Sequence, residues 1–253
     1  KANYFRRSFK RKKLIMAGHS HWAGIKHKKG RQDKERSKLF SKLSREITVA
    51  AKLGDSDPNT NPRLRSAIHA AKQSNMPKEN IKRAINKSEL NSKQNYESLR
   101  YEGYGIFNTA LIIETLTDNK NRTASKIRTI LQKHGGRLGE NGSTSHLFIN
   151  CGIIQIKYNH IKEDQALEIA INAGANDCNT NKDYHEIICE MKKFYDVKSK
   201  IEKKISNFLY SGIEWRPYSK IDLSDEQKKK VLQMLENLDE IDDVQNIFIN
   251  CNI

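Results

Sequence analysis

The first third of the chain places apolar residues at the spacing of amphipathic helices. Between residues 37 and 52 they recur every three or four positions, and Gly54 follows as a stop. The same pattern returns after Asn61-Pro62, where proline occupies the first helical position, and again after Pro77. We therefore predict three helices, the first over residues 37–52, the second from Pro62, and the third from Pro77 to about Lys87.

After a polar stretch at residues 88–95, which is typical of a linker, strands and helices alternate. The predicted strands cover residues 99–106, 109–116, 152–158, 184–190, 213–215 and 244–249. The predicted helices cover residues 122–133, 163–173, 197–210 and 225–238, with a capping turn at residues 118–121 and Ser224 as an N-cap. This alternation is typical of compact α+β units, either consecutive or one inserted in the other.

The positive charge lies in the first third of the chain. The formal net charge is +16, yet residues 1–15 carry seven Lys and Arg without an acid, and residues 16–95 carry 18 basic against 7 acidic side chains. A one-sided field of this kind attracts a polyanion. Nucleic acid is the first candidate and an anionic membrane surface the second, but no apolar run approaches the roughly 20 residues of a spanning helix. We therefore expect no membrane partner.

Enzyme and metal signatures are missing from the sequence. There is no GxxxxGK[ST], HExxH or GxSxG motif, and the four cysteines are widely separated without a CxxC pair. His19, His21 and His27 match no closed zinc site, because no fourth ligand is near. The sequence thus predicts a non-enzymatic protein of a reducing compartment, with no cofactor and no metal.

A basic segment from Met16 is the main candidate for binding a polyanion, because cations can neutralise phosphates and an indole can stack on a base. Only Asp33 and Glu35 offset its cations, so the run carries like-charge repulsion. The predicted nucleic-acid-binding residues here are His19, Trp22, Lys26, His27, Lys28, Lys29, Arg31, Lys34, Arg36 and Lys38. Two other interpretations stay open: Trp22 packs on the first helix, and the cations form a solvated face.

Two further places are candidates. Arg63 and Arg65 stand at the start of the second predicted helix, where a phosphate would suit the dipole; pairing with Asp55 or Asp57 is the other interpretation. The glycine-rich segment at residues 135–142 follows a helix, so it is either a helix stop with a mobile loop or a loop that contacts RNA or protein through Arg137.

Together these segments resemble the YebC/PmpR family, whose mitochondrial members are translational activators of cytochrome c oxidase subunit I. The resemblance is carried by residues 16–30, 37–51, 61–65, 75–81, 101–105, 117–123, 133–143 and 242–246. It extends from Met16 to the C-terminus. Family members usually continue Tyr-Glu-Gly-Tyr-Gly with Pro-Gly-Gly, whereas residues 106–109 here read Ile-Phe-Asn-Thr. Residues 1–15 have no counterpart, which favours Met16 as the natural start.

The resemblance implies an α+β fold of three domains, an N-terminal helical domain plus two α+β domains of the ferredoxin-like type, one inserted in the other. We place a basic tail or upstream extension at residues 1–15 and the helical nucleic-acid-binding domain at 16–95. One α+β domain then comprises residues 96–150 and 213–253, and the inserted one comprises 151–212. The implied location is the cytoplasm, or the mitochondrial or another organellar matrix in a eukaryotic host.

For function, the resemblance implies a factor in gene expression. We expect a monomer or weak dimer that binds ribosomal or transfer RNA on the ribosome and supports translation of difficult stretches such as consecutive prolines. The alternative is a DNA-binding transcriptional regulator. The third helix offers Lys78, Asn80, Lys82 and Arg83 mainly as phosphate binders, and it has few bidentate base readers, which favours RNA.

Overall fold

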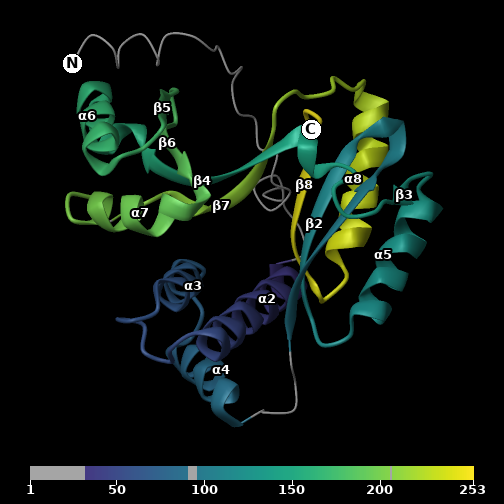
Figure 1. The fold of residues 1–253 in the computed structure, drawn as a ribbon, viewed down its shortest axis with the longest axis horizontal. Coiled ribbons are helices and arrows are strands. Elements are labelled where there is room, and N and C mark those ends of the chain that lie inside the picture. The colour runs from purple at the N-terminus through teal and green to yellow at the C-terminus, as the bar shows by residue number, and fades with distance from the viewer. Residues whose placement is uncertain (1–31, 91–95, 206) are drawn as a thin grey trace. The chain divides into compact units, whose positions relative to one another are not determined.

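The computed structural model describes residues 32–90, 96–205 and 207–253 (Figure 1). The predictions for residues 1–31 therefore lie outside the described residues. The described chain forms two compact units. One comprises Leu147–Ser219, and the other comprises the described residues on both sides of that segment, up to His146 and from Lys220. One unit is thus inserted into the other.

The helical part of the larger unit consists of α2 (Gln32–Leu53), α3 (Pro62–Gln73) and α4 (Lys78–Leu90). All three predicted helices are confirmed, and α2 begins earlier than its apolar pattern indicated. Their apolar stripes meet in one core of Ile47, Ala50, Ala51, Leu64, Ala67, Ala71, Met76, Ile81 and Ala84. Asn61 caps α3 by accepting a hydrogen bond from the Leu64 N–H at 3.0 Å, while its amide donates to the Ala50 carbonyl.

The same unit contains an antiparallel sheet in the order β3-β1-β2-β8. Its strands are β1 (Glu97–Tyr104), β2 (Ala110–Thr117), β3 (Arg137–Leu138) and β8 (Val244–Ile249). Helices α5 (Lys120–Lys133) and α8 (Asp225–Asp239) cover one face of this sheet (Figure 1). The core between them contains Leu111, Ile113, Ile127, Leu131, Val231, Leu235, Ile247 and Ile249.

The inserted unit repeats this architecture with a second antiparallel sheet, in the order β5-β6-β4-β7. Its strands are β4 (Phe148–Lys157), β5 (Asp177–Thr180), β6 (Tyr184–Glu190) and β7 (Tyr210–Pro217). Helices α6 (Glu163–Ala173) and α7 (Phe194–Glu202) pack on it through Ala170, Phe194, Val197 and Ile201, against Ile154, Ile156 and Ile187. The expected α+β class is therefore confirmed.

The predicted extent of the second helix of the inserted unit is wrong. The helix predicted over residues 197–210 ends at Glu202, and Tyr210 already begins β7. The reason is pairing with a distant strand: the Leu209 N–H donates to the Gln155 carbonyl at 2.8 Å, and Tyr210 faces Gln155 in the ladder. Because β7 pairs with β4, it belongs to the inserted unit, so the boundary placed at residue 213 differs from the structure.

The hairpin between β1 and β2 contains two residues other than glycine in the left-handed region. Phe107 has φ of 61° and Asn108 has φ of 56°. These positions lie in the segment where the family pattern has Pro-Gly-Gly, and glycine takes such angles without the Cβ clash that other residues meet. Phe107 is retained at this cost because its ring packs against the core of the first sheet.

This strain predicts a reversal of the usual order of alanine and glycine. Both Phe107→Ala and Phe107→Gly lose the ring packing, but only the alanine keeps the strained Cβ. We expect the glycine variant to be more stable than the alanine variant by about 1 kcal/mol in denaturant unfolding, whereas glycine is usually the weaker by about that amount. A more stable alanine variant would contradict the assigned backbone conformation.

Candidate nucleic-acid interface

Part of the predicted interface can be located in the structure. His19, Trp22, Lys26, His27, Lys28, Lys29 and Arg31 lie outside the described residues. Lys34 belongs to α2, but only its backbone is described. Arg36 is exposed, and its guanidinium lies 5.3 Å from the Phe40 ring centroid.

Further along α2, three cations face the α+β part of the same unit. Lys38 pairs with Asp239 at 3.2 Å, and Lys42 pairs with the other oxygen of that carboxylate. The Lys38 side chain is only 19% exposed. The third cation, Arg45, pairs with Asp243 at 3.1 Å and donates to the carbonyl groups of Leu116 and Asp242. This face of α2 is therefore occupied by internal ion pairs, and Lys38 has an internal partner.

Asp243 is the centre of this contact. Its side chain is 6% exposed, and besides Arg45 it accepts a hydrogen bond from the Thr123 hydroxyl at 2.7 Å and lies 3.4 Å from Arg122. Desolvation by burial would raise the pKa of Asp243, but the Thr123 hydroxyl and the two guanidinium groups outweigh it and lower the pKa. The carboxylate thus stays charged and joins α2 to the start of α5.

The two arginines at the start of α3 are held by neighbours in the bundle. Arg63 makes two contacts with Glu46, at 2.7 and 3.1 Å, and Arg65 donates to the Asn59 carbonyl at 3.2 Å. Asp55, which the sequence offered as a partner, accepts a hydrogen bond from the Thr60 hydroxyl at 2.7 Å, and this bond lowers the pKa of Asp55. Arg65 remains exposed beside the helix start.

A groove of about 500 Å³ lies between α2 and α4. The α2 wall carries a stripe of hydroxyl side chains on one helical face, from Ser37, Ser41, Ser44 and Thr48. The Thr48 hydroxyl is buried and donates to the carbonyl groups of Ser44 and Ala84, and the Ser41 hydroxyl donates to the carbonyl of Ser37. The α4 wall presents Asn80, Arg83 and Lys87, and Phe40, Arg45 and Tyr96 complete the polar and aromatic lining. Among the residues that the structure describes, none that lines this groove carries a carboxylate.

The cations of α4 are open to a ligand. Lys78, Lys82, Arg83 and Lys87 are exposed, and none of the four makes an ion pair with a described residue. Arg83 and Lys87 are one turn apart and both line the groove. From the sequence, Lys78, Lys82 and Arg83 were expected only as phosphate binders, and Lys87 was not a candidate. The hydroxyl spacing of four, three and four residues on α2 was the signal that could have found the groove.

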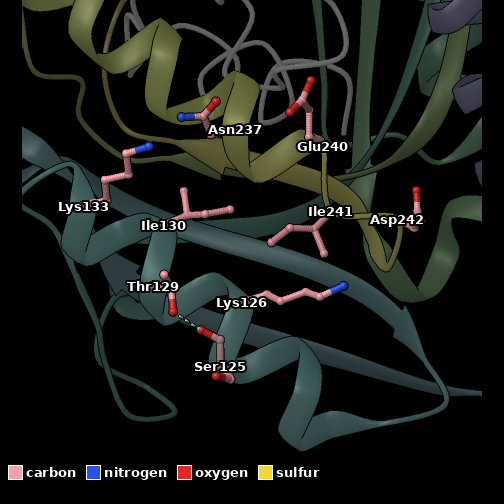
Figure 2. Close-up of a pocket in the computed structure, with 9 residues that line it drawn as sticks. All are labelled: Ser125, Lys126, Thr129, Ile130, Lys133, Asn237, Glu240, Ile241 and Asp242. Atoms are coloured by element: carbon pink, nitrogen blue, oxygen red, sulfur yellow. Dashed lines mark hydrogen bonds between the residues drawn. The ribbon is translucent and has the colours of Figure 1, made fainter.

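A second groove, of about 460 Å³, lies between α5 and α8 and carries mixed charge. Figure 2 shows Lys126 and Lys133 projecting from α5 toward the gap, across from Glu240 and Asp242 at the end of α8. Acids on one wall repel a polyanion, so this groove suits it less than the groove between α2 and α4.

Arg137, the predicted loop contact, lies on the edge strand β3. Its guanidinium is 5.0 Å from the Tyr104 ring centroid, and its side chain is exposed. The segment after it is tied to β1, because the buried Glu102 carboxylate accepts hydrogen bonds from the Thr144 and Ser145 N–H groups at 2.9 and 2.8 Å. Desolvation opposes these bonds, yet together with Arg100 they lower the pKa of Glu102. The connection that follows Arg137 is thus held to β1 by hydrogen bonds.

The described residues contain neither a cluster of metal-ligating side chains nor a helix that could span a membrane. No three His, Cys, Asp or Glu side chains in them come together as a metal site would require, and the absence of a metal stays a prediction. None of the helices in these ranges has the length and apolar character needed to cross a membrane.

Comparison with protein families gives two matches that together span most of the chain. Residues 20–91 match the TACO1/YebC protein N-terminal domain, and residues 96–251 match the TACO1/YebC second and third domain. The junction between the matches falls in the segment between α4 and β1.

Individual proteins show the same similarity. A probable transcriptional regulatory protein of Pelagibacter ubique is 55% identical over 237 residues, which cover 94% of this chain and 98% of that protein. The crystal structure of a conserved hypothetical protein from Aquifex aeolicus has a TM-score of 0.78 and 43% identity, and the match covers 91% of this chain and 96% of that one.

Removing the charge of Asp243 should loosen the contact between α2 and α5. We expect Asp243→Asn to lower the free energy of unfolding by about 3 kcal/mol at neutral pH, because Arg45 loses its buried partner. Since folding lowers the pKa of Asp243 below its usual 3.8, the difference from wild type should persist above that pH and shrink as the pH falls through the lowered pKa. Denaturant unfolding across pH measures this.

The matched control is Asp242→Asn, which neutralises the neighbouring, exposed carboxylate. It should change stability by less than about 0.5 kcal/mol. Equal effects of the two substitutions would show that the network around Asp243 contributes nothing beyond general charge.

Proposed function

The chain belongs to the TACO1/YebC family, and from this premise we propose that it is a non-enzymatic factor in gene expression whose helical bundle binds RNA. The observation that carries the proposal is the groove between α2 and α4. It combines Arg83 and Lys87, which make no ion pair with a described residue, with hydroxyl side chains, and none of its described lining residues is acidic. Lys, Arg, Ser and Thr are the side chains that commonly contact phosphates and sugars.

The shape of this site favours RNA over duplex DNA. A helix that reads the major groove must enter it and offer bidentate side chains to the base edges. Here Asn80 and Arg83, the side chains of α4 best suited to that task, line a groove against α2. A concave site of this kind suits an extended strand or a folded RNA, where hydroxyl groups can also meet the ribose 2′-OH.

For the cellular role, we propose that the RNA is ribosomal or transfer RNA and that the protein supports translation on the ribosome. This follows the resemblance to the family and the phosphate-binding character of α4. A second candidate, regulation of transcription through DNA, is favoured by the relative from Pelagibacter ubique, a probable transcriptional regulatory protein. Both roles use the same positive field, so affinity alone does not separate them.

Replacing the two groove cations tests the site itself. We expect Arg83→Ala with Lys87→Ala to weaken binding of a single-stranded RNA about tenfold and to reduce the slope of log K against log salt by about 1.4, the loss of two phosphate contacts. Fluorescence anisotropy across salt concentrations measures both quantities.

The matched control is Lys229→Ala with Lys230→Ala, which removes two exposed cations from α8 and leaves the groove intact. This pair should retain nearly the wild-type affinity and slope. If both double variants lose the same affinity, general charge and not the groove holds the RNA.

A competition experiment separates the two cellular roles. We expect ribosomal RNA and transfer RNA to displace a labelled RNA from the protein, while a promoter duplex does so no better than a scrambled duplex at physiological salt. In lysates, co-sedimentation with ribosomes should survive DNase. A large preference for one promoter, or loss of sedimentation after DNase alone, would favour the transcriptional role.

A further inference from the structure

A second cationic surface lies in the inserted unit, outside the first third of the chain where the net positive charge is concentrated. It comprises the short 3₁₀ segment Met191–Lys193 and α7 with the turn after it. Five exposed lysines project from it, and we call them the α7 lysine patch: Lys192, Lys193, Lys200, Lys203 and Lys204.

Several of these ammonium groups are open. Lys193 pairs with Glu190 at 3.2 Å, and Lys200 donates to the carbonyl of Ala173 at 3.4 Å. The other three, Lys192, Lys203 and Lys204, make no ion pair with any described residue.

The acids within residues 191–204 do little to neutralise the patch. Of the two acids in residues 191–204, Glu202 lies 3.7 Å from the buried Lys198, a lysine outside the patch. Asp196 remains as the one exposed acid among the described residues of this segment that has no such partner. The patch therefore keeps a net positive charge.

The lysines of the patch are not part of a positive charge spread evenly over the inserted unit. Residues 147–219 contain ten basic and ten acidic side chains, so the inserted unit is neutral as a whole. Six of those ten bases nevertheless fall within residues 191–204. A neutral unit with most of its cations gathered in one short segment presents a local positive field, which attracts an anionic partner to that segment.

We propose that the α7 lysine patch binds the phosphate backbone of RNA as a second contact, separate from the groove between α2 and α4; this inference rests on the proposed function. The exposed side chains of the segment are lysines with Met191, Asp196 and Ser199, so the patch lacks exposed Arg, Asn, Gln and aromatic groups. Lysine acts on phosphate as a point charge, whereas base readout needs planar or stacking groups.

An acidic protein is a weaker occupant for this surface. Protein interfaces centre on apolar and aromatic anchors, with charges at the rim. In the segment that forms the patch, Met191 is the exposed large apolar side chain, at 38% exposure. A surface made almost entirely of lysines fits a nucleic-acid strand, which carries a negative charge at every nucleotide.

Two contacts on one strand predict a dependence on RNA length. A short RNA of about 10 nucleotides, the span of one binding surface, engages the groove alone. A long RNA reaches the second surface as well, and the linked contacts raise its affinity through effective concentration. The α7 lysine patch should thus matter for long RNA and not for short RNA.

The test compares two triple variants of the full chain with the same change of charge. One is Lys192→Ala, Lys203→Ala and Lys204→Ala. Its control is Lys157→Ala, Lys162→Ala and Lys182→Ala, which removes three other exposed lysines of the inserted unit. Binding to a short and a long single-stranded RNA is measured by anisotropy across salt, and thermal unfolding checks that both variants fold.

We expect the patch variant to bind the long RNA about tenfold more weakly, with a salt slope lower by about 2.1, and to bind the short RNA as wild type does. The control should resemble wild type with both. If the patch variant and its control bind RNA alike, the proposed second contact is overturned. It is also overturned if the patch variant binds both RNAs as wild type does and loses only the binding of a poly-glutamate peptide, measured in the same way. The double variant Arg83→Ala with Lys87→Ala separates this inference from the proposed function, because unchanged RNA binding by that variant overturns the proposed function itself.

Discussion

The ion pair between Arg45 and the buried carboxylate of Asp243 is the contact on which the arrangement of the larger unit depends. A charge removed from water is costly unless it is paired and hydrogen-bonded, and Asp243 meets this requirement with groups from α2 and the start of α5. The carboxylate therefore favours one placement of α2 beside the sheet. The apolar core of the bundle, with Ala50 on α2 and Ile81 and Ala84 on α4, then holds α4 against α2, and the groove lies between these two helices.

This constraint divides the cations of α2 and α4 into two groups. Lys38, Lys42 and Arg45 are paired within the molecule, while Arg83 and Lys87 are open to a ligand. The formal charge of α2 therefore overstates the positive field that a ligand meets there, because three of its cations are already paired. On α4, in contrast, Arg83 and Lys87 can act on a ligand directly. The inserted unit shows the opposite case, because its neutral total conceals the α7 lysine patch. In both units, the distribution of paired and unpaired charge matters more than the sum.

Four of the segments that carry the family resemblance are tied together in pairs by hydrogen bonds. Thr123, in the segment 117–123, donates to Asp243, in the segment 242–246. Glu102, in the segment 101–105, holds Thr144 and Ser145, which directly follow the segment 133–143. Tyr104 adds a hydrogen bond to the carbonyl of Ser143 at 2.8 Å. These residues stabilise the fold, and the open cations of α4 lie outside these two networks.

The sequence by itself determined what depends on near neighbours: the helices of the bundle, the strand at residues 244–249, the capping turn at residues 118–121 and the cap at Ser224, because apolar spacing and capping act within a few residues. Only the tertiary structure decided the end of α7, the two-residue strand β3, and the partners of Lys38 and Arg63. The physical reason is that each depends on a group distant in the chain, as when the Gln155 carbonyl draws Leu209 into a ladder or Asp239 pairs with Lys38. The groove between α2 and α4 likewise exists only once the apolar core of the bundle brings its two walls together, through Ile47 and Ala50 on α2 and Ile81 and Ala84 on α4.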